Sequence, residues 1–261
     1  MKKRIVLCAD DYGQAPAISQ GILALVKSGR LSAVSCLVTT PYWREHAEWL
    51  KPFLPQIDVG LHFNLTEGKT SLPKLMVRAA LHQIDRQAIA AELNQQIDLF
   101  MGAIGRLPDF IDGHQHVHQF PVIRDVLLGV YEKRFKNQKP YIRLVNEGLK
   151  PRDLMCDVKK VLVHVMGAKA LKRLLQKHEI PHNQSFSGMY SFSKAAQYEK
   201  VFPLFLADIG EGGIVMCHPG MPASQPGDPI ATARYLEYQY LSGVRFKVDC
   251  EAQGIEIGRF G

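Results

Sequence analysis

Residues 5–13 read I-V-L-C-A-D-D-Y-G, an apolar run that ends in two adjacent carboxylates, a tyrosine and a glycine. Apolar runs without polar alternation are typical of strands that are buried on both faces of a parallel sheet. In parallel α/β folds the active site lies at the carboxyl ends of the strands. We therefore predict a buried strand over Ile5–Ala9 that delivers Asp10 and Asp11 to this edge.

The rest of the chain alternates short apolar runs with segments of helical periodicity, which predicts an α/β fold with a parallel sheet covered by helices. The number of such units in 261 residues favours one (β/α) barrel-like domain over residues 1–261, which can be incomplete or irregular. An open doubly wound sheet is the alternative. The segment 66–85 has no clear period and is expected to form a lid or rim loop. Further strands are predicted at 34–38, 59–63, 110–111, 141–145 and 214–217, and helices at 89–104, 151–178 and 229–241.

Composition and charge exclude several classes of protein. The formal net charge is +7, with much of the basic charge between Lys133 and Lys177. No aromatic side chain interleaves with these charges after Tyr141, as an RNA-binding surface requires, so no nucleic-acid partner is expected. No apolar stretch is long enough for a membrane span. The apolar region after the basic N-terminus is too short for a signal peptide, and five cysteines without a C-x-x-C motif favour a reducing compartment, so we expect a cytoplasmic protein.

Ionisable side chains follow four of the predicted strands. Because the carboxyl ends of parallel strands meet at one edge of the sheet, we expect these side chains to lie close together. Carboxylate and imidazole groups gathered in this way are typical ligands of a divalent metal ion. The groups are Asp10 and Asp11 after the first strand, His62 at the end of the third, Asp112, His114, His116 and His118 at the fourth, and His218 after 214–217.

The segment 112–118, D-G-H-Q-H-V-H, carries three histidines at alternate positions. If the strand continues, these histidines share one face; if it ends at Gly113, they spread over a loop. The spacing alone does not select the ligand among them. The adjacent carboxylates of Asp10 and Asp11 repel each other unless a cation or hydrogen-bond donors offset the repulsion. We interpret one of them as a metal ligand and the other as a group that transfers protons.

Taken together, four segments resemble the YdjC-like family, which includes chito-oligosaccharide deacetylases. The resemblance extends over about residues 4–250 and implies a (β/α) barrel-like fold related to the polysaccharide deacetylases. Some relatives are associated with lipid-linked sugars, so the resemblance does not fix the substrate. The segments are A-D-D-Y-G (9–13), G-L-H-F-N-L-T (60–66), D-G-H-Q-H-V-H (112–118) and M-C-H-P-G (216–220).

The resemblance also implies roles for individual residues. Asp11, His62 and His114 would bind one divalent ion, Asp10 would be the general base and His218 the general acid. Family members are often described with Mg²⁺, whereas nitrogen ligands favour Zn²⁺, so both ions remain candidates. The residues that would contact the substrate or support the ligands are His116, His118, Asp112 and Arg143.

We therefore expect a metal-dependent hydrolase that removes an N-acetyl group from an amino-sugar substrate, either a free N-acetylated sugar or a glycolipid. Two alternatives remain. The positive charge suits another metallohydrolase such as a phosphoesterase, although phosphoesterases usually carry H-x-H on the first strand. A non-catalytic sugar-binding protein is the other alternative. The sequence is also compatible with a homodimer through Leu23, Tyr235, Tyr238 and Tyr240, although ordinary helix packing explains these residues equally well.

Overall fold

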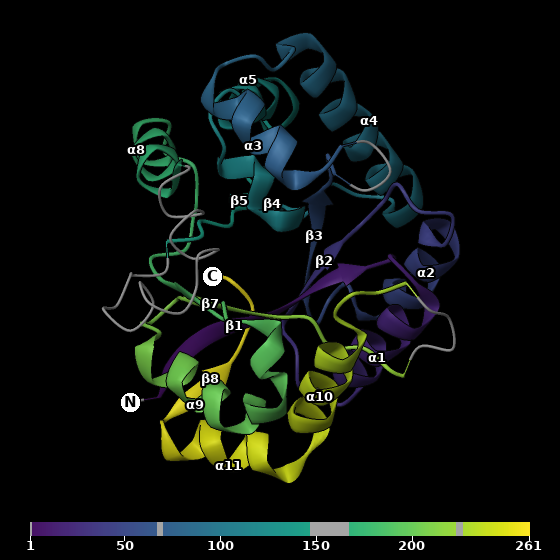
Figure 1. The fold of residues 1–261 in the computed structure, drawn as a ribbon, viewed down its shortest axis with the longest axis vertical. Helices are drawn as coiled ribbons and strands as arrows, with labels where there is room; N and C mark the ends of the chain where they lie inside the picture. The colour runs from purple at the N-terminus through teal and green to yellow at the C-terminus, as the bar shows by residue number, and fades with distance from the viewer. Residues whose placement is uncertain (1, 67–69, 147–166, 223–226) are drawn as a thin grey trace. The chain divides into compact units, whose positions relative to one another are not determined.

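The computed structural model describes residues 2–66, 70–146, 167–222 and 227–261, and the chain divides into two compact units (Figure 1). The first unit contains Met1–Cys36, Thr40–Val59 and Gln184–Gly261, and the second contains Leu37–Thr39 and Gly60–Asn183. Each unit has its own parallel strands and helices. The division into two compact units does not test the prediction of a single domain over residues 1–261, which stays a prediction.

The first unit is built around β1 (Lys3–Tyr12), whose residues from Ile5 onward are all buried. This strand pairs in parallel with β2 (Ala33–Cys36), β7 (Ile214–Cys217) and β8 (Ile255–Ile257). β7 pairs in parallel with β6 (Phe186–Ser187). The predicted strand at 5–9 is confirmed, and it extends through both aspartates. Strands β6 and β8 have no counterpart among the predicted strands, because two or three residues carry too little periodicity to be read.

The second unit contains the end of β3 (Asp58–Phe63), β4 (Phe110–Gly113) and β5 (Tyr141–Ile142). All are parallel, with Leu61 opposite Ile111 and Ile111 opposite Ile142. Every residue of these strands is buried, which explains their apolar composition.

Helices cover the strands of each unit. In the first unit, α9 (Tyr198–Asp208), α10 (Ala231–Ser242) and α11 (Val244–Ala252) contact one another, and α1 (Pro16–Lys27) contacts α10 (Figure 1). For Tyr240 the sequence is compatible with either a dimer interface or helix packing; its side chain is buried here and donates a hydrogen bond to Asp249, so helix packing accounts for it. The helices of this unit are α1 (Pro16–Lys27), α2 (Trp43–Leu50), η1 (Lys51–Phe53), η4 (Phe192–Gln197), α9 (Tyr198–Asp208), α10 (Ala231–Ser242) and α11 (Val244–Ala252).

The helices of the second unit include one that the sequence did not predict. α3 (Leu72–Ala80) lies inside the segment expected to be an irregular loop, and that expectation is wrong. Its proline stands at the start of the helix, where proline is tolerated, and Leu75 and Ala79 bury one face. The predicted helix at 151–178 is confirmed over α8, and its residues 151–166 lie outside the described chain. The other helices among the described residues of this unit are α4 (Arg86–Ile104), η2 (His114–Gln119), α5 (Ile123–Arg134) and α8 (Lys169–Lys177).

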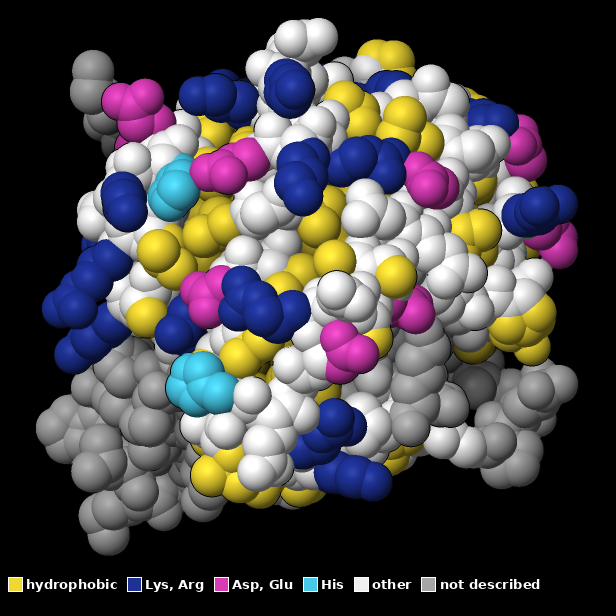
Figure 2. All heavy atoms as spheres, turned by 90° about the horizontal axis from the view of Figure 1, so that it is seen from above, with side chains coloured by type: hydrophobic (Ala, Val, Ile, Leu, Met, Phe, Trp, Pro, Cys, Tyr) yellow, Lys and Arg dark blue, Asp and Glu magenta, His cyan; other side chains and the backbone are white. Residues whose placement is uncertain are grey.

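The described residues were compared with the requirements for a membrane span and for a basic surface patch. Among the described residues, no helix combines the length and the apolar character needed to cross a membrane. Figure 2 shows one face of the molecule, on which Lys and Arg side chains are interspersed with Asp and Glu. On this face the net charge of +7 therefore does not form an uninterrupted basic patch.

Helix α1 lies directly against the turn that follows β7. A Cβ atom added at Gly21 of α1 would come within 2.8 Å of the Cα atom of Gly220, so only glycine allows this approach. The backbone N–H of Met221 donates to the carbonyl of Ala17 at 2.9 Å, which fixes the turn to the helix. This close contact holds the residues that follow His218.

We predict that Gly21→Ala destabilises the protein by about 1–3 kcal/mol, because the added methyl group meets backbone atoms that cannot move aside. The matched control is Gly129→Ala in α5, where nothing lies within 4 Å of the added Cβ. There alanine should stabilise the helix by about 0.5–1 kcal/mol. Urea unfolding of the two variants measures both effects, and a stabilised Gly21→Ala variant would contradict the close packing.

Candidate functional site

The aspartates of β1 lie in a β-bulge. Ala9 pairs with Val34 and Tyr12 with Cys36, so β1 has one more residue than β2 over this interval. Asp11 has a φ of 68°, a left-handed conformation that is uncommon for a residue other than glycine. Bulges of this kind re-aim side chains and are frequent beside active sites. Asp10 and Asp11 are both buried.

Arg234 of α10 holds the carboxylate of Asp11. Its Nη2 donates to Oδ2 of Asp11 at 2.7 Å and to Oε1 of Gln14 at 3.0 Å, and its Nε donates to Oδ2 of Asp228 at 2.6 Å. Burial disfavours the charged guanidinium, but the carboxylates of Asp11 and Asp228 outweigh this effect and raise the pKa of Arg234 above its ordinary value. The negative charge of Asp11 is thus balanced within the first unit.

His218 follows β7 and is held through its backbone. Its N–H donates to Oε2 of Glu237, and the hydroxyl of Tyr190 donates to Oε1 of Glu237 at 2.7 Å. The ring of Phe192 meets the imidazole of His218 edge to face, with 5.4 Å between the ring centroids. Burial raises the pKa of the Glu237 carboxyl to about 7, although both hydrogen bonds and Arg234 act to lower it.

The second unit contains a chain of buried polar contacts that begins at His62. Nδ1 of His62 donates to Oδ1 of Asp112 at 2.6 Å, and Nη2 of Arg143 contacts Oδ2 of the same carboxylate at 2.9 Å. The carbonyl of Arg143 accepts a hydrogen bond from Nε2 of His118 at 2.8 Å. With Nδ1 bound to a carboxylate, His62 would use Nε2 to bind an ion, and this carboxylate–histidine arrangement is common behind metal ligands.

The three histidines at alternate positions are separated by the backbone. Strand β4 ends at Gly113, so the alternative in which the histidines share one strand face is wrong. Gln115 and His116 have φ values of 54° and 61°, which turn the chain sharply after His114. The imidazole of His114 lies edge to face with that of His62, with 5.3 Å between the ring centroids.

The other two histidines lie deeper in the second unit. His118 is fully buried, and burial lowers the pKa of its imidazole to about 4, so it is neutral at physiological pH. A Cβ atom at Gly113 would come within 2.9 Å of the backbone nitrogen and Nδ1 of His118, which explains the glycine. His116 is also buried.

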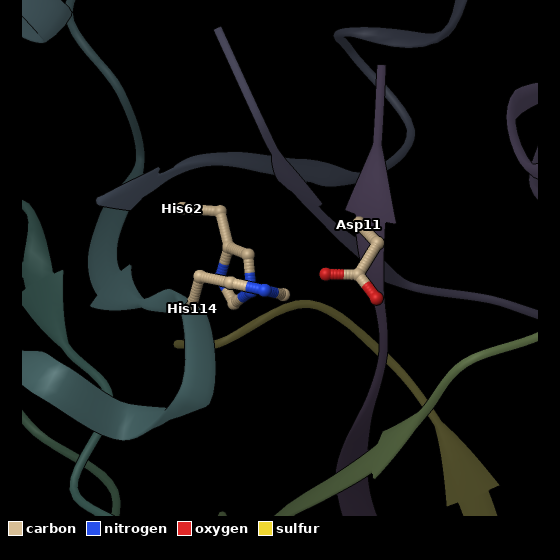
Figure 3. A group of neighbouring side chains, drawn as sticks. All are labelled: Asp11, His62 and His114. Atoms are coloured by element: carbon tan, nitrogen blue, oxygen red, sulfur yellow. The ribbon is translucent and has the colours of Figure 1, made fainter. Parts of the chain in front are cut away.

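Asp11 of the first unit and His62 and His114 of the second are the residues drawn in Figure 3. Asp11 comes from the end of β1, His62 from the end of β3, and His114 from the residue after β4. One carboxylate and two imidazoles are ligand types that a catalytic divalent ion takes. The donor chemistry of these residues therefore fits a metal ion.

Arg234 and Glu237 are two residues that the sequence analysis missed. On a predicted helix, an arginine and a glutamate three positions apart resemble an ordinary surface ion pair. Their spacing could have indicated burial. Arg234 and Glu237 lie on the same helix face as Ala233, Tyr240 and Leu241, which is the buried face of α10. Asp228 lies two residues before Ile230, the N-cap of α10, and accepts a hydrogen bond from Arg234.

Comparison with known proteins gives a family and a fold. The model of the family described as YdjC-like protein matches residues 4–252. A carbohydrate deacetylase of Danio rerio is 33% identical over 147 residues, which cover 49% of this chain and 46% of that protein. A carbohydrate deacetylase of Enterococcus faecalis is 34% identical over 131 residues, covering 44% and 50%. This chain therefore spans about half the length of these two relatives. The human carbohydrate deacetylase is 27% identical over 86% of this chain and 77% of its own length.

Two solved structures share the fold. A protein of Enterococcus faecalis V583, provisionally assigned to cellobiose-phosphate cleavage, superposes with a TM-score of 0.75 at 20% identity over 100% of this chain and 98% of that chain. The Bc1960 peptidoglycan N-acetylglucosamine deacetylase superposes with a TM-score of 0.54 at 11% identity, over 99% and 86%. These similarities confirm the predicted α/β fold related to the polysaccharide deacetylases, and at such identities they establish the fold alone.

The raised pKa of Glu237 makes stability depend on pH. Between pH 4.5 and about 7 the unfolded chain has released the Glu237 proton while the folded protein keeps it, so each rise in pH within this window favours unfolding. Glu237→Gln has no proton to release, and its amide oxygen still accepts a hydrogen bond.

We therefore predict that the wild type loses stability relative to Glu237→Gln by on the order of 3 kcal/mol between pH 4.5 and 8. Urea unfolding of both metal-free proteins across this range measures the difference. If the difference in stability is the same at every pH, Glu237 is not protonated in the folded state near neutral pH.

Proposed function

Because the chain belongs to the YdjC-like protein family, we propose that it is a metal-dependent hydrolase that removes an N-acetyl group from an amino sugar. The observation that carries this proposal is the buried contact of His62 with Asp112, which Arg143 completes. Such a carboxylate fixes the ring orientation and the tautomer of a metal-ligating histidine. The names of the relatives, carbohydrate deacetylases, supply the substrate class.

We assign Asp11, His62 and His114 as the ligands of one divalent ion. Three protein ligands leave coordination positions for water and substrate, as a catalytic site requires. In this assignment Nε2 of His62 binds the ion, since Nδ1 is bound to Asp112. The nitrogen-rich ligand set favours Zn²⁺ over Mg²⁺, and Mg²⁺ remains the other candidate.

The residues behind these ligands have positioning roles. Arg143 is fully buried and contacts Asp112, so we assign it to the support of His62 rather than to contact with the substrate. His118 donates to the carbonyl of Arg143 and is packed against Gly113, which links the loop of histidines to the same network. His116 lies between His114 and His118 in a left-handed turn, and we assign it to the shape of this loop.

Hydrolysis of an N-acetyl group breaks the amide C–N bond and forms a C–O bond, giving acetate and a free amine. A divalent ion bound at this site lowers the pKa of water and polarises the acetyl carbonyl. Asp10 takes the proton of the attacking water, and His218 gives a proton to the leaving nitrogen. Each transfer of this kind contributes about 10²–10⁴-fold to the rate. Glu237 and Phe192 hold His218 in place for this step.

The first prediction from this proposal concerns acetate release. The metal-stripped protein should release no acetate from N-acetylated sugars, and addition of Zn²⁺ or Mg²⁺ should raise the rate at least about 100-fold, because the ion supplies several kcal/mol of transition-state stabilisation. The substrate panel contains chito-oligosaccharides and lipid-linked N-acetylglucosamine, with Co²⁺ as a further ion. Phosphate release from phosphorylated sugars in place of acetate would favour a phosphoesterase. Metal binding without any turnover would favour a sugar-binding protein.

A second prediction separates metal binding from proton transfer. Asp10→Asn should keep its metal and lose about 10²–10⁴-fold in turnover, whereas His114→Ala should lose the metal itself. The controls are Asp98→Asn and His82→Ala, which change exposed residues of the second unit. Metal content and kcat of the four variants give the result. Normal activity of Asp10→Asn removes Asp10 from the mechanism, and a full metal content of His114→Ala moves the ligand role to His116 or His118.

A further inference from the structure

Helix α10 carries a buried arginine on the stripe where an amphipathic helix normally places apolar residues. Arg234 lies on the same face as Ala233, Tyr240 and Leu241, and only 4% of its side chain is exposed. Replacing a buried ion pair by apolar residues is often neutral or stabilising, so stability alone gives no reason for an arginine here. In addition, Nη1 of Arg234 is buried with no hydrogen-bond partner among the described residues.

The guanidinium of Arg234 connects two carboxylates through different nitrogens. Nη2 binds Oδ2 of Asp11, and Nε binds Oδ2 of Asp228 on the other side. Asp228 thereby fixes the plane of the guanidinium, and the guanidinium fixes the carboxylate of Asp11. The planar fork of arginine makes this arrangement, which the single nitrogen of lysine cannot reproduce.

The backbone of Arg234 reaches a second part of the first unit. Its carbonyl accepts a hydrogen bond from the N–H of Gly220 at 3.0 Å, in the turn H-P-G that begins at His218. A Cβ atom at Gly220 would lie within 3.3 Å of the Cβ of Arg234, so the turn packs directly on this residue. One residue therefore contacts both Asp11 and the turn that carries His218.

We propose that Arg234 is a positioning residue that, anchored by Asp228, orients the carboxylate of Asp11 toward the metal ion. This inference rests on the proposed function, in which Asp11 is a ligand. With Arg234 bound to Oδ2, Asp11 would hold the ion with a carboxylate whose orientation is already set. Asp11 lies in the β-bulge of β1 and has a left-handed backbone conformation. Its pairing with Arg234 holds the carboxylate in one orientation before a metal ion binds.

The test measures Zn²⁺ and Mg²⁺ affinity by competition with a chromophoric chelator, together with thermal unfolding of the metal-free proteins. Two variants weaken the contact at different points: Arg234→Lys keeps the charge and loses the fork, and Asp228→Asn leaves Arg234 and Asp11 intact and removes the anchor. The matched control is Arg245→Lys, which changes an exposed arginine paired with Asp249 on α11.

We expect Arg234→Lys to bind the ion about 10–100-fold more weakly, as is typical when the partner of a metal ligand is changed. Asp228→Asn should shift the affinity in the same direction by a smaller factor, and Arg245→Lys should bind as the wild type does. Metal-free Asp228→Asn should unfold within a few degrees of the wild type, which separates positioning from a loss of folding.

The measured metal affinities distinguish a failure of the positioning role of Arg234 from a failure of the proposed metal site. If the wild type binds the ion and both folded variants bind it equally well, Arg234 does not position Asp11, and the proposed function stands. If Arg234→Lys does not fold, the affinity of Asp228→Asn decides. If the wild type binds neither Zn²⁺ nor Mg²⁺, the proposed metal site itself is wrong and this inference falls with it.

Discussion

A buried carboxylate is stable only when it is paired with a cation and with hydrogen-bond donors. This requirement applies in both units of the protein. In the first unit the buried Asp11 is paired with Arg234, and in the second the buried Asp112 is paired with Arg143. Each arginine comes from a different part of the chain from its aspartate, so the pairs form only in the folded state.

In the function that we propose, Asp112 supports a metal ligand, whereas Asp11 is itself a metal ligand. Asp112 acts through His62, because a carboxylate on Nδ1 directs Nε2 to the ion. Asp11 acts directly as a ligand, with its orientation set by the bulge of β1 and by Arg234. Side chains held in this way are ordered within their own unit before an ion and a substrate bind, which reduces the reorganisation that catalysis requires.

Sequence patterns predicted the strands and the polar groups at their ends because both follow local rules. The buried run at 5–9 and the aspartates after it needed only apolar periodicity and backbone preference. Contacts between residues that are far apart in the chain could not be predicted from these local patterns. The extra residue in β1 becomes visible only against β2, and Arg234 looks like a surface residue until α10 is packed. Helix α3 was missed because a proline at a helix start also suits a loop.

If Asp11, His62 and His114 bind one divalent ion, anomalous diffraction from crystals grown with Zn²⁺ will detect it. Data collected on both sides of the zinc absorption edge locate the ion independently of any assumed ligands. We expect one strong peak, with Asp11, His62 and His114 as its protein ligands. A peak bound by His116 or His118 in place of these residues, or crystals with no bound zinc, would contradict it.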